Sequence, residues 1–390
     1  MRPAILKLGC RNFRSYRALT LNFWSRFVVF FGKNGAGKTN ILESISLFSS
    51  DRGLRKASIS DFSNFNTKID GWNLELVSEK DEYKTFLETG FANGRRFGKI
   101  DGSSVGSLAA LEESLWLLWI TPSMDTIFIG SKTDRRNFFD HLVSGYDKKY
   151  KDRLKRIQNL QKERLSVLSY RRDETWLNIL ENRIAEESVF VARSRFEFIE
   201  QLQKVFENYY SNFLRPKVSI NGKIENIVEV SSEEDAVLEI SDILKSFRDN
   251  DREKQVTNIS VNKSSWLIYH PKNQMEAENC STGEQKAFLI SLVLAVARIY
   301  QKSRKGIPVL LLDDLMMHLD KTRRKTLVEE LLELNIQTFF TGTEQYLFDD
   351  LSDIAQIFHV ENSICSEIYS ERLINRGKEI DLKKIINFCK

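Results

Sequence analysis

The stretch FVVFFGKNGAGKT, residues 27–39, decides the fold of this chain. It begins with a continuous apolar run, the pattern expected of a short β-strand buried on both faces. The glycine-rich segment that follows fits the pattern G-x-x-x-x-G-K-[ST], and the residues after it predict a helix from about Lys38 through Leu47. A strand, this loop and a helix in that order are the context of a phosphate-binding loop. The sequence therefore predicts an α/β, P-loop type of fold with a mixed sheet.

The loop residues have chemical roles that favour a nucleotide over a simple turn. Glycines let backbone N–H groups surround a phosphate, and the helix N-terminus adds positive potential. Lys38 would reach the β- and γ-phosphates, and Thr39 would hold Mg²⁺. The alternative, a glycine-rich turn into a helix, is disfavoured because every position of the motif is filled. The residues expected to bind ATP in this loop are Gly32, Lys33, Asn34, Gly35, Ala36, Gly37, Lys38 and Thr39.

A second apolar strand ends in two carboxylates. The stretch VLLLDD, residues 309–314, reads as a buried strand followed by Asp313 and Asp314. In a P-loop fold a Mg²⁺-binding aspartate belongs at this place, so Asp313 is the expected metal ligand together with Thr39. Asp314 would face the attacking water as base or orienter. The alternative is a strand that ends in a solvated acidic turn. The catalytic set predicted from both motifs is Lys38, Asp313 and Asp314.

The STGEQK segment, residues 281–286, precedes a long apolar helix. Ser281 and Glu284 fit a capping box, with the serine at N-cap and the glutamate at N3. That structural interpretation does not account for Gly283 and Gln285. A helix N-terminus with a free hydroxyl and a flexible glycine can also bind an anion, so both interpretations stay open here.

The rest of the chain suggests two α/β halves around an insert. In the N-terminal part, apolar periodicity predicts a hairpin of 5–8 and 19–23 and antiparallel strands over 71–100 with a turn near Gly94. The middle part is predicted to contain helices over 132–212 and one short helix near 233–247 in an otherwise irregular 215–265. The C-terminal part is predicted to contain helix 283–300, strand 308–312, helix 321–334, strand 336–341, and a short strand with a basic tail in 359–390. The predicted domains are an N-terminal ATPase half (1–130), a mostly helical lid (131–265) and a C-terminal ATPase half (266–390).

Composition excludes several other classes. The chain has 390 residues, 42% of them hydrophobic, and a net charge of +4, which are ordinary values for a soluble globular protein. The four cysteines are scattered without a C-x-x-C pair, so neither a zinc ribbon nor a disulfide framework is expected. The N-terminus has no apolar core of a signal peptide, and no apolar run approaches a membrane span. A cytoplasmic protein is the simplest expectation.

The positive charge gathers in the predicted insert. Residues 132–172 contain 13 Lys or Arg and 5 Asp or Glu, a net of +8. A solvated helix face is the usual explanation of such a run. Because the excess is one-sided, we also predict contacts to a nucleic-acid backbone, with strong salt dependence and no base reading. The expected DNA-binding residues are Lys148, Lys149, Lys151, Arg153, Lys155 and Arg156.

Together these motifs resemble the RecF family, bacterial recombination ATPases related to SMC proteins and the ATP-binding-cassette superfamily. The resemblance covers nearly the whole length. It rests on the phosphate loop, the STGEQK segment and the LLLDD strand, and on the following further stretches: NFRSY (12–16), TPSMD (121–125), DRR (134–136), Phe139-Asp140 and HLD (318–320).

The resemblance implies an ATP-dependent homodimer that binds DNA. Ser281, Gly283 and Gln285 would then act in trans on the γ-phosphate held by the partner subunit, and Asp320 would lie in a dimer-contacting loop. Arg14 would reach the nucleotide phosphates. The family implies slow, Mg²⁺-dependent ATP hydrolysis, binding to single-stranded and duplex DNA at gaps or junctions, and recombinase loading with RecO and RecR in replication and repair. No membrane partner is implied.

Some features depart from related families. Many RecF sequences carry a Gly-Pro-His-Arg run before the STGEQK segment, and residues 260–263 read Ser-Val-Asn-Lys instead. The strand ending at Thr343 lacks the histidine of transporter cassettes, so Thr343 is a candidate γ-phosphate sensor. If the chain were a transporter ATPase, we would expect an L-S-G-G-Q segment and that histidine, and the sequence has neither. If the chain were an SMC-like or nuclease-linked ATPase, we would expect long heptad repeats or an added nuclease domain, and the sequence shows neither.

Overall fold

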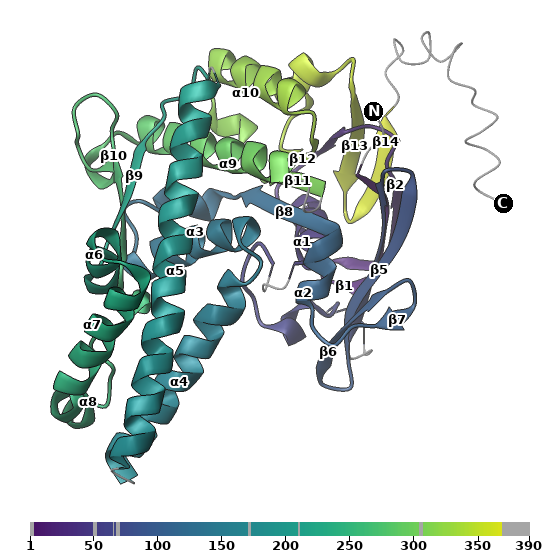
Figure 1. The fold of residues 1–390 in the computed structure, drawn as a ribbon. Coiled ribbons are helices and arrows are strands. Elements are labelled where there is room, and N and C mark those ends of the chain that lie inside the picture. The colour runs from purple at the N-terminus through teal and green to yellow at the C-terminus, as the bar shows by residue number, and fades with distance from the viewer. Residues whose placement is uncertain are drawn as a thin grey trace. The chain divides into compact units, whose positions relative to one another are not determined.

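The computed structural model describes residues 4–49, 53–64, 66–67, 71–170, 173–209, 211–303 and 307–368. The chain divides into two compact units, shown together in Figure 1. Unit 1 comprises residues 1–124 and 300–390, and unit 2 comprises residues 125–299. Within the described ranges, the helices are all too short or too polar to span a lipid bilayer.

Unit 1 contains a six-stranded, mostly parallel sheet in the order β14-β13-β3-β12-β11-β8. Its central strand β3 is Phe27–Phe31, and four of its five residues are buried, as the apolar run predicted. The parallel neighbours of β3 are β12 and β13, which come late in the chain. The other bounds are β8 (Leu115–Ile120), β11 (Ile307–Leu312), β12 (Gln337–Gly342), β13 (Ala355–Glu361) and β14 (Ile364–Ile368).

A second, antiparallel sheet in unit 1 has the order β2-β1-β4-β5-β6-β7. The predicted N-terminal hairpin and the strands over 71–100 are confirmed, with tight turns at Asp81–Glu82 and Asn93–Gly94, where the chain takes positive φ. The bounds are β1 (Ile5–Phe13), β2 (Tyr16–Asn22), β4 (Trp72–Lys80), β5 (Tyr83–Ala92), β6 (Arg95–Ile100) and β7 (Ser103–Ser104).

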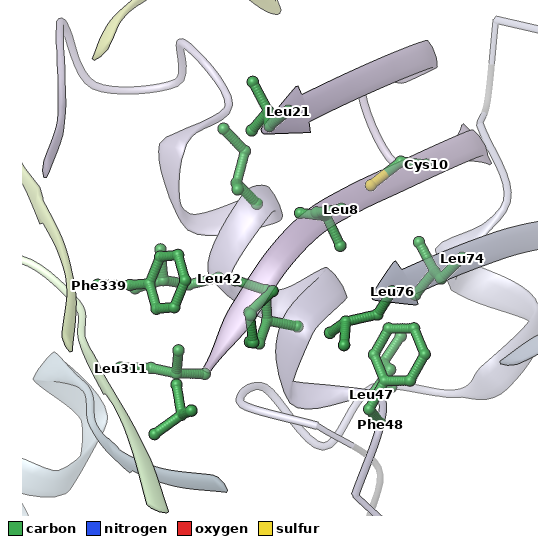
Figure 2. Packing of buried hydrophobic residues seen from close by; sticks show 14 of the residues in the cluster. Leu8, Cys10, Leu21, Leu42, Leu47, Phe48, Leu74, Leu76, Leu311 and Phe339 are labelled. Carbon is green, nitrogen blue, oxygen red and sulfur yellow. The ribbon is translucent and has the colours of Figure 1, made fainter. Parts of the chain in front are cut away.

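Helix α1 (Lys38–Ser46) connects the two sheets through the core of unit 1. Its buried Leu42 belongs to one cluster with Leu8 of β1 and Phe339 of β12, as Figure 2 shows. Burial on two sides explains why residues 41–46 of this helix are all buried. The remaining helices of unit 1 are α2 (Ala109–Ser114) and α10 (Lys321–Leu334). The confirmed α/β class follows from this sheet–helix–sheet packing.

Unit 2 is organised around one long helix. Helix α5 (Glu174–Asn208, 35 residues) contacts α4, α6, α7 and the short strand β9. The predicted helical region 132–212 is therefore confirmed, and α4 and α5 lie side by side in Figure 1. The other bounds are α3 (Lys132–Tyr146), α4 (Tyr150–Tyr170), α6 (Lys223–Val230), α7 (Glu233–Ser246), α8 (Arg248–Lys254), α9 (Thr282–Ser303), β9 (Lys217–Asn221) and β10 (Ser265–Tyr269).

The expectation of irregular structure in residues 215–265 was wrong. Besides the predicted helix near 233–247, this stretch contains β9, α6 and α8. Strand β9 pairs with β10, far along the chain, and such a pairing leaves no local signal. The N-cap of α6 is Gly222, which makes no side-chain cap, and α8 (RDNDREK) carries no apolar periodicity. The basic tail predicted for the C-terminus lies outside the described residues.

The two units divide the chain differently from the predicted domains. The sequence suggested an insert ending at residue 265, whereas unit 2 continues to residue 299 and includes most of α9. Compactness alone does not show that a unit folds independently. The boundaries of independent domains therefore stay a prediction.

A buried arginine connects four helices of unit 2. The side chain of Arg195 on α5 is fully buried and donates to Glu225 of α6 (2.6 Å), Asp140 of α3 (3.0 Å) and Tyr150 of α4 (2.7 Å). A second buried arginine, Arg164, joins α4 to Glu181 of α5 and to Asp251 of α8. A charge in such a place is tolerated only because it is fully paired.

Replacing Arg195 by methionine should therefore destabilise unit 2 strongly. Arg195→Met leaves the carboxylates of Asp140 and Glu225 without their cation, and losing one member of a buried pair costs about 3–5 kcal/mol. Urea unfolding measures the change. The control is Arg252→Met, which removes the exposed pair with Asp249 (2.8 Å) and should cost less than about 1 kcal/mol. Equal losses in the free energy of unfolding of Arg195→Met and Arg252→Met would contradict the proposed contribution of the buried network to stability.

Candidate nucleotide-binding site

The phosphate loop turns sharply between β3 and α1. Gly32, Gly35 and Gly37 have φ values of 151°, 80° and 110°, a range that disfavours residues with a Cβ. At Gly37 a Cβ would also lie 2.8 Å from the hydroxyl of Tyr16. Glycine is thus required at Gly37 for both its conformation and its close approach to the β1–β2 hairpin.

The loop is anchored from the C-terminal part of unit 1. The N–H of Gly32 donates to the carbonyl of Gly342, at the end of β12, at 3.2 Å. The carbonyl of Ala36 accepts from the N–H of Ser363, in the β13–β14 turn, at 3.0 Å. These bonds fix both sides of the loop. The N-cap residue of α1 is Gly37, which has no side chain, and the first turn of α1 carries no acidic residue, so the positive end of its dipole is not neutralised by the helix itself.

Lys38 is the buried cation of the loop. Its side chain ammonium donates to the carbonyls of Gly32 (2.7 Å) and Lys33 (3.0 Å), and the residue is only 4% exposed. Burial lowers the pKa of Lys38, while the charges of Asp314 and Asp313 act in the opposite direction. The sequence placed Lys38 and the two aspartates in one site, and the structure brings them together.

Thr39 and Asp313 are in direct contact. The hydroxyl of Thr39 donates to Oδ1 of Asp313 at 2.9 Å, and the hydroxyl of Thr341 donates to the same oxygen at 2.7 Å. Burial raises the pKa of Asp313, and these two hydrogen bonds oppose that rise. The predicted partnership of the phosphate loop and the acidic strand is thus visible as a hydrogen bond between their key side chains.

Asp314 follows in a left-handed turn with φ of 50°. Its backbone N–H donates to the hydroxyl of Thr341 at 2.8 Å. Its side chain Oδ1 is buried and has no hydrogen-bond partner within the described part of the chain. A buried carboxylate oxygen without a donor is costly in a structure that makes no use of it. Asp314 is therefore available to accept a proton or to orient a polar group.

These residues fit a magnesium ion. Mg²⁺ prefers oxygen ligands and is commonly held by one or two carboxylates together with substrate phosphates. Thr39 and Asp313 present such oxygens next to each other, and Asp314 adds an unpaired one. No group of three or more His, Cys, Asp or Glu able to hold a metal occurs in the described ranges. The donor set therefore suits a metal shared with a nucleotide rather than a cage made by protein alone.

Arg14 has partners within unit 1. Its guanidinium makes a two-point contact with the buried Glu43 (2.8 and 3.0 Å), donates to the carbonyl of Asp61 and lies over the ring of Phe62. Reaching a phosphate would require Arg14 to share or leave this carboxylate. The predicted nucleotide contact of Arg14 stays a prediction, and Glu43 is a partner that the sequence did not reveal.

Two further hydroxyl groups lie at the site, and no role was predicted for either of them from the sequence. Tyr16 donates to the carbonyl of Gly37 at 3.2 Å, and Thr341 contacts both aspartates. Thr343, the residue singled out as a phosphate sensor, lies just beyond β12. Position within β12 was the available signal: the last residues of a strand parallel to β11 reach the same sheet edge as Asp313.

The STGEQK segment in unit 2 forms the predicted capping box. Glu284 accepts from the N–H of Ser281 (2.8 Å), and the hydroxyl of Ser281 accepts from the N–H of Glu284 (3.3 Å). Ser281 is exposed, whereas Gln285 is buried and donates to the carbonyl of Cys280 at 3.0 Å. His270 lies 3.6 Å from Glu284. The capping box is thus confirmed. The side chain of Ser281 is exposed, whereas that of Gln285 is hydrogen-bonded to the loop that precedes α9.

Asp320 and one member of the predicted basic cluster, Arg153, have partners within the chain itself. Asp320, expected in a dimer-contacting loop, is the N-cap of α10 and accepts from the N–H of Arg323 at 2.9 Å. In the basic cluster, Arg153 pairs with Glu187 (2.9 Å) and lies over the ring of Phe190. The sequence-predicted cluster is present at the start of α4, where its exposed members are Lys148, Lys149, Lys155 and Arg156.

Comparisons with known proteins define the class first. The family described as RecF/RecN/SMC N terminal domain matches residues 4–366. The chain also resembles a solved SMC head domain from Pyrococcus furiosus, with a TM-score of 0.54, 17% identity and coverage of 97% of this chain and 99% of that one. The chain therefore belongs to the RecF/RecN/SMC N-terminal domain family of P-loop proteins.

Within that family the match to RecF is much closer. The chain is 35% identical to the DNA replication and repair protein RecF of Mesorhizobium japonicum, over 92% of this chain and 96% of the relative. It is 32% identical to RecF of Rickettsia bellii, over 89% and 96%. A solved structure described as the recombination mediator protein RecF-ATP in the RecFOR pathway shares the fold, with a TM-score of 0.81, 24% identity and coverage of 93% and 99%. The chain belongs to the RecF family.

Proposed function

We propose that the chain binds ATP with Mg²⁺ in unit 1 and that ATP closes a homodimer that holds DNA in replication and repair. The observation that carries this proposal is the contact between Thr39 and Asp313 (2.9 Å), because it assembles a phosphate loop and an acidic strand end into one site. The names of the RecF relatives and the nucleotide in the RecF-ATP structure support the choice of ligand and process.

In this proposal each side chain has one task. The loop N–H groups and Lys38 bind the phosphates, and Lys38 exchanges its two carbonyl partners for phosphate oxygens. Thr39 and Asp313 hold Mg²⁺, which when bound neutralises phosphate charge. Asp314 uses its unpaired oxygen to orient a water molecule. Hydrolysis is slow and resets the dimer.

The STGEQK segment supplies the dimer contact. Ser281 is exposed at the N-terminus of α9, a helix of 22 residues. Its hydroxyl donates to Glu284 at 2.7 Å, and in this proposal it exchanges that carboxylate for an anion from another molecule, to which the first-turn N–H groups also donate. We place the γ-phosphate of the partner subunit there. Each subunit alone then has an incomplete site, and ATP acts as the link between two copies. Asp320, exposed at the start of α10, also contacts the partner in this proposal.

The helical insert supplies the DNA contact. Lys148, Lys149, Lys155 and Arg156 are exposed, and a backbone-directed interaction needs only such cations. We propose that the protein works in the cytoplasm with RecO and RecR at single-stranded gaps. This fits the relative described within the RecFOR pathway.

Lys38→Ala should abolish nucleotide binding. At a hundredfold excess of ATP over its Kd, ligand binding stabilises a protein by about 2.7 kcal/mol, and the variant should lose this gain. Thermal melting with and without Mg²⁺ and ATP measures it. The control is Lys7→Ala, which removes an exposed lysine of β1 outside the loop and should keep the shift. A full ATP-dependent shift in Lys38→Ala would contradict the site assignment.

Ser281→Arg should block the dimer without unfolding the chain. Loss of the cap costs about 1 kcal/mol, while a guanidinium would fill the space needed by the partner's nucleotide. The variant should bind ATP normally yet remain monomeric by light scattering, and its ATP turnover should fall. Ser232→Arg is the control, because Ser232 caps α7 in the same way by accepting from the N–H of Asp235. An ATP-induced dimer of Ser281→Arg would leave the segment as a capping box only.

Charge reversal in the basic cluster at the start of α4 should weaken DNA binding. Lys149 and Lys155 are both exposed, and changing both to Glu should lower the slope of log affinity against log salt by about 0.9 for each lost duplex contact. The loss should be similar for all DNA sequences, and ATP binding should not change. The control changes the exposed Lys217 and Lys254 to Glu, with the same change in net charge. Equal affinities and slopes in the two variants would move the DNA site elsewhere.

A further inference from the structure

Thr341 makes an unusual pair of hydrogen bonds for one buried hydroxyl. It lies in β12, is fully buried, and donates to Oδ1 of Asp313 at 2.7 Å. The same oxygen atom of Thr341 accepts from the backbone N–H of Asp314 at 2.8 Å. A single side chain thus contacts both residues at the end of the acidic strand.

The sheet explains this placement. Strands β11 and β12 are parallel, and Leu312 is paired with Phe340. The next residues along the two strands, Asp313 and Thr341, therefore lie level with each other at the carboxyl edge of the sheet. Because β12 sits between β3 and β11, its backbone is fixed on both sides. The position of Thr341 is therefore well fixed relative to Asp313 and Asp314, the two residues that follow β11.

The positions of Asp313 and Asp314 both depend on hydrogen bonds to Thr341. Oδ1 of Asp313 receives hydrogen bonds from Thr39 and Thr341, and without Thr341 it would keep only the donor from the phosphate loop. Asp314 adopts a φ of 50°, a region sparsely populated by residues other than glycine. The hydrogen bond from its N–H to Thr341 holds the backbone in that turn. The direction of the Asp314 side chain follows from this backbone conformation.

We propose that Thr341 is a positioning residue that sets both carboxylates for the magnesium nucleotide, an inference that rests on the proposed function. It touches neither nucleotide nor metal in this scheme. Its hydroxyl fixes the Asp313 carboxylate next to Thr39 and fixes the turn that aims Asp314. Groups of this kind behind a metal ligand typically contribute ten- to hundredfold to metal affinity or activity.

Strand β12 provides a matched control. Thr338 is also fully buried, but its hydroxyl has no hydrogen-bond partner among the described residues. Thr341→Val and Thr338→Val therefore make the same chemical change in the same strand. Only the first removes contacts to the acidic residues.

The experiment measures ADP binding with EDTA and with Mg²⁺, by calorimetry, for the wild type, Thr341→Val, Thr341→Ser and Thr338→Val. We expect Thr341→Val to bind ADP in EDTA as the wild type does and to lose about tenfold in the gain that Mg²⁺ gives. In ATP turnover, kcat should fall more than KM rises. Thr341→Ser, which keeps the hydroxyl, should recover most of both. Thr338→Val should match the wild type throughout.

Two outcomes separate the inference from the proposed function. If the wild type shows no Mg²⁺-dependent nucleotide binding, the proposed site fails and the inference fails with it. If Mg²⁺ increases the ADP affinity of the wild type, Thr338→Val and Thr341→Val by the same factor, the nucleotide site is supported and the proposed role of Thr341 is wrong. Should Thr341→Val not fold, Thr341→Cys replaces it, because a thiol of similar size is a weak hydrogen-bonding group. An equal Mg²⁺ gain in Thr341→Cys and Thr341→Ser overturns the inference in the same way.

Discussion

The hydrogen bond between Thr39 and Asp313 joins residues 274 positions apart, and the architecture of unit 1 serves to make it possible. The hydroxyl is placed by α1, which is packed between the two sheets, and the carboxylate is placed by β11. Between them stands β12, whose Thr341 contacts the same carboxylate oxygen. A change in strand order or in the register of β12 on β11 would separate these groups. The parallel sheet is therefore the element that determines the site, and the antiparallel sheet covers the other side of α1.

Unit 2 is stabilised in a different way. Where unit 1 has a large apolar core, unit 2 also relies on arginines that are buried and fully paired with carboxylates from several helices. Such pairs contribute little net free energy, yet each member is needed once the other is buried. They constrain which helices can be neighbours, because Arg195 requires partners from α3, α4 and α6 together. The STGEQK segment and the basic start of α4 are both carried by this unit.

The sequence predicted most of the site because its motifs are local. A buried strand, a glycine loop and a helix follow one another directly, so β3 and α1 were found with bounds close to the observed ones. Asp313 could be added because it ends an apolar strand. The end of β12 could be assigned to the same sheet edge as Asp313, but the pairing of Thr341 with Asp313 could not be predicted, since the register of two strands is a tertiary property. For the same reason the contact of Arg14 with Glu43 could not be predicted, and the phosphate contact that the family resemblance implies for Arg14 stays a prediction. Helix α8 escaped notice because the side chain it buries, Asp251, is charged.

The position of β3 between β12 and β13 has a consequence for the synthesis of the chain. The phosphate loop is translated early, but both strands that flank β3, and the Ser363 turn that bonds to Ala36, belong to the last parts of the described chain to leave the ribosome. Until then the apolar strand FVVFF has neither of its neighbours, and exposed strands of this kind favour aggregation. The growing chain must keep this segment covered while more than three hundred residues are added. We expect the nascent protein to depend on chaperones over that interval, and the nucleotide site to be completed only after β12 and β13 have been synthesised.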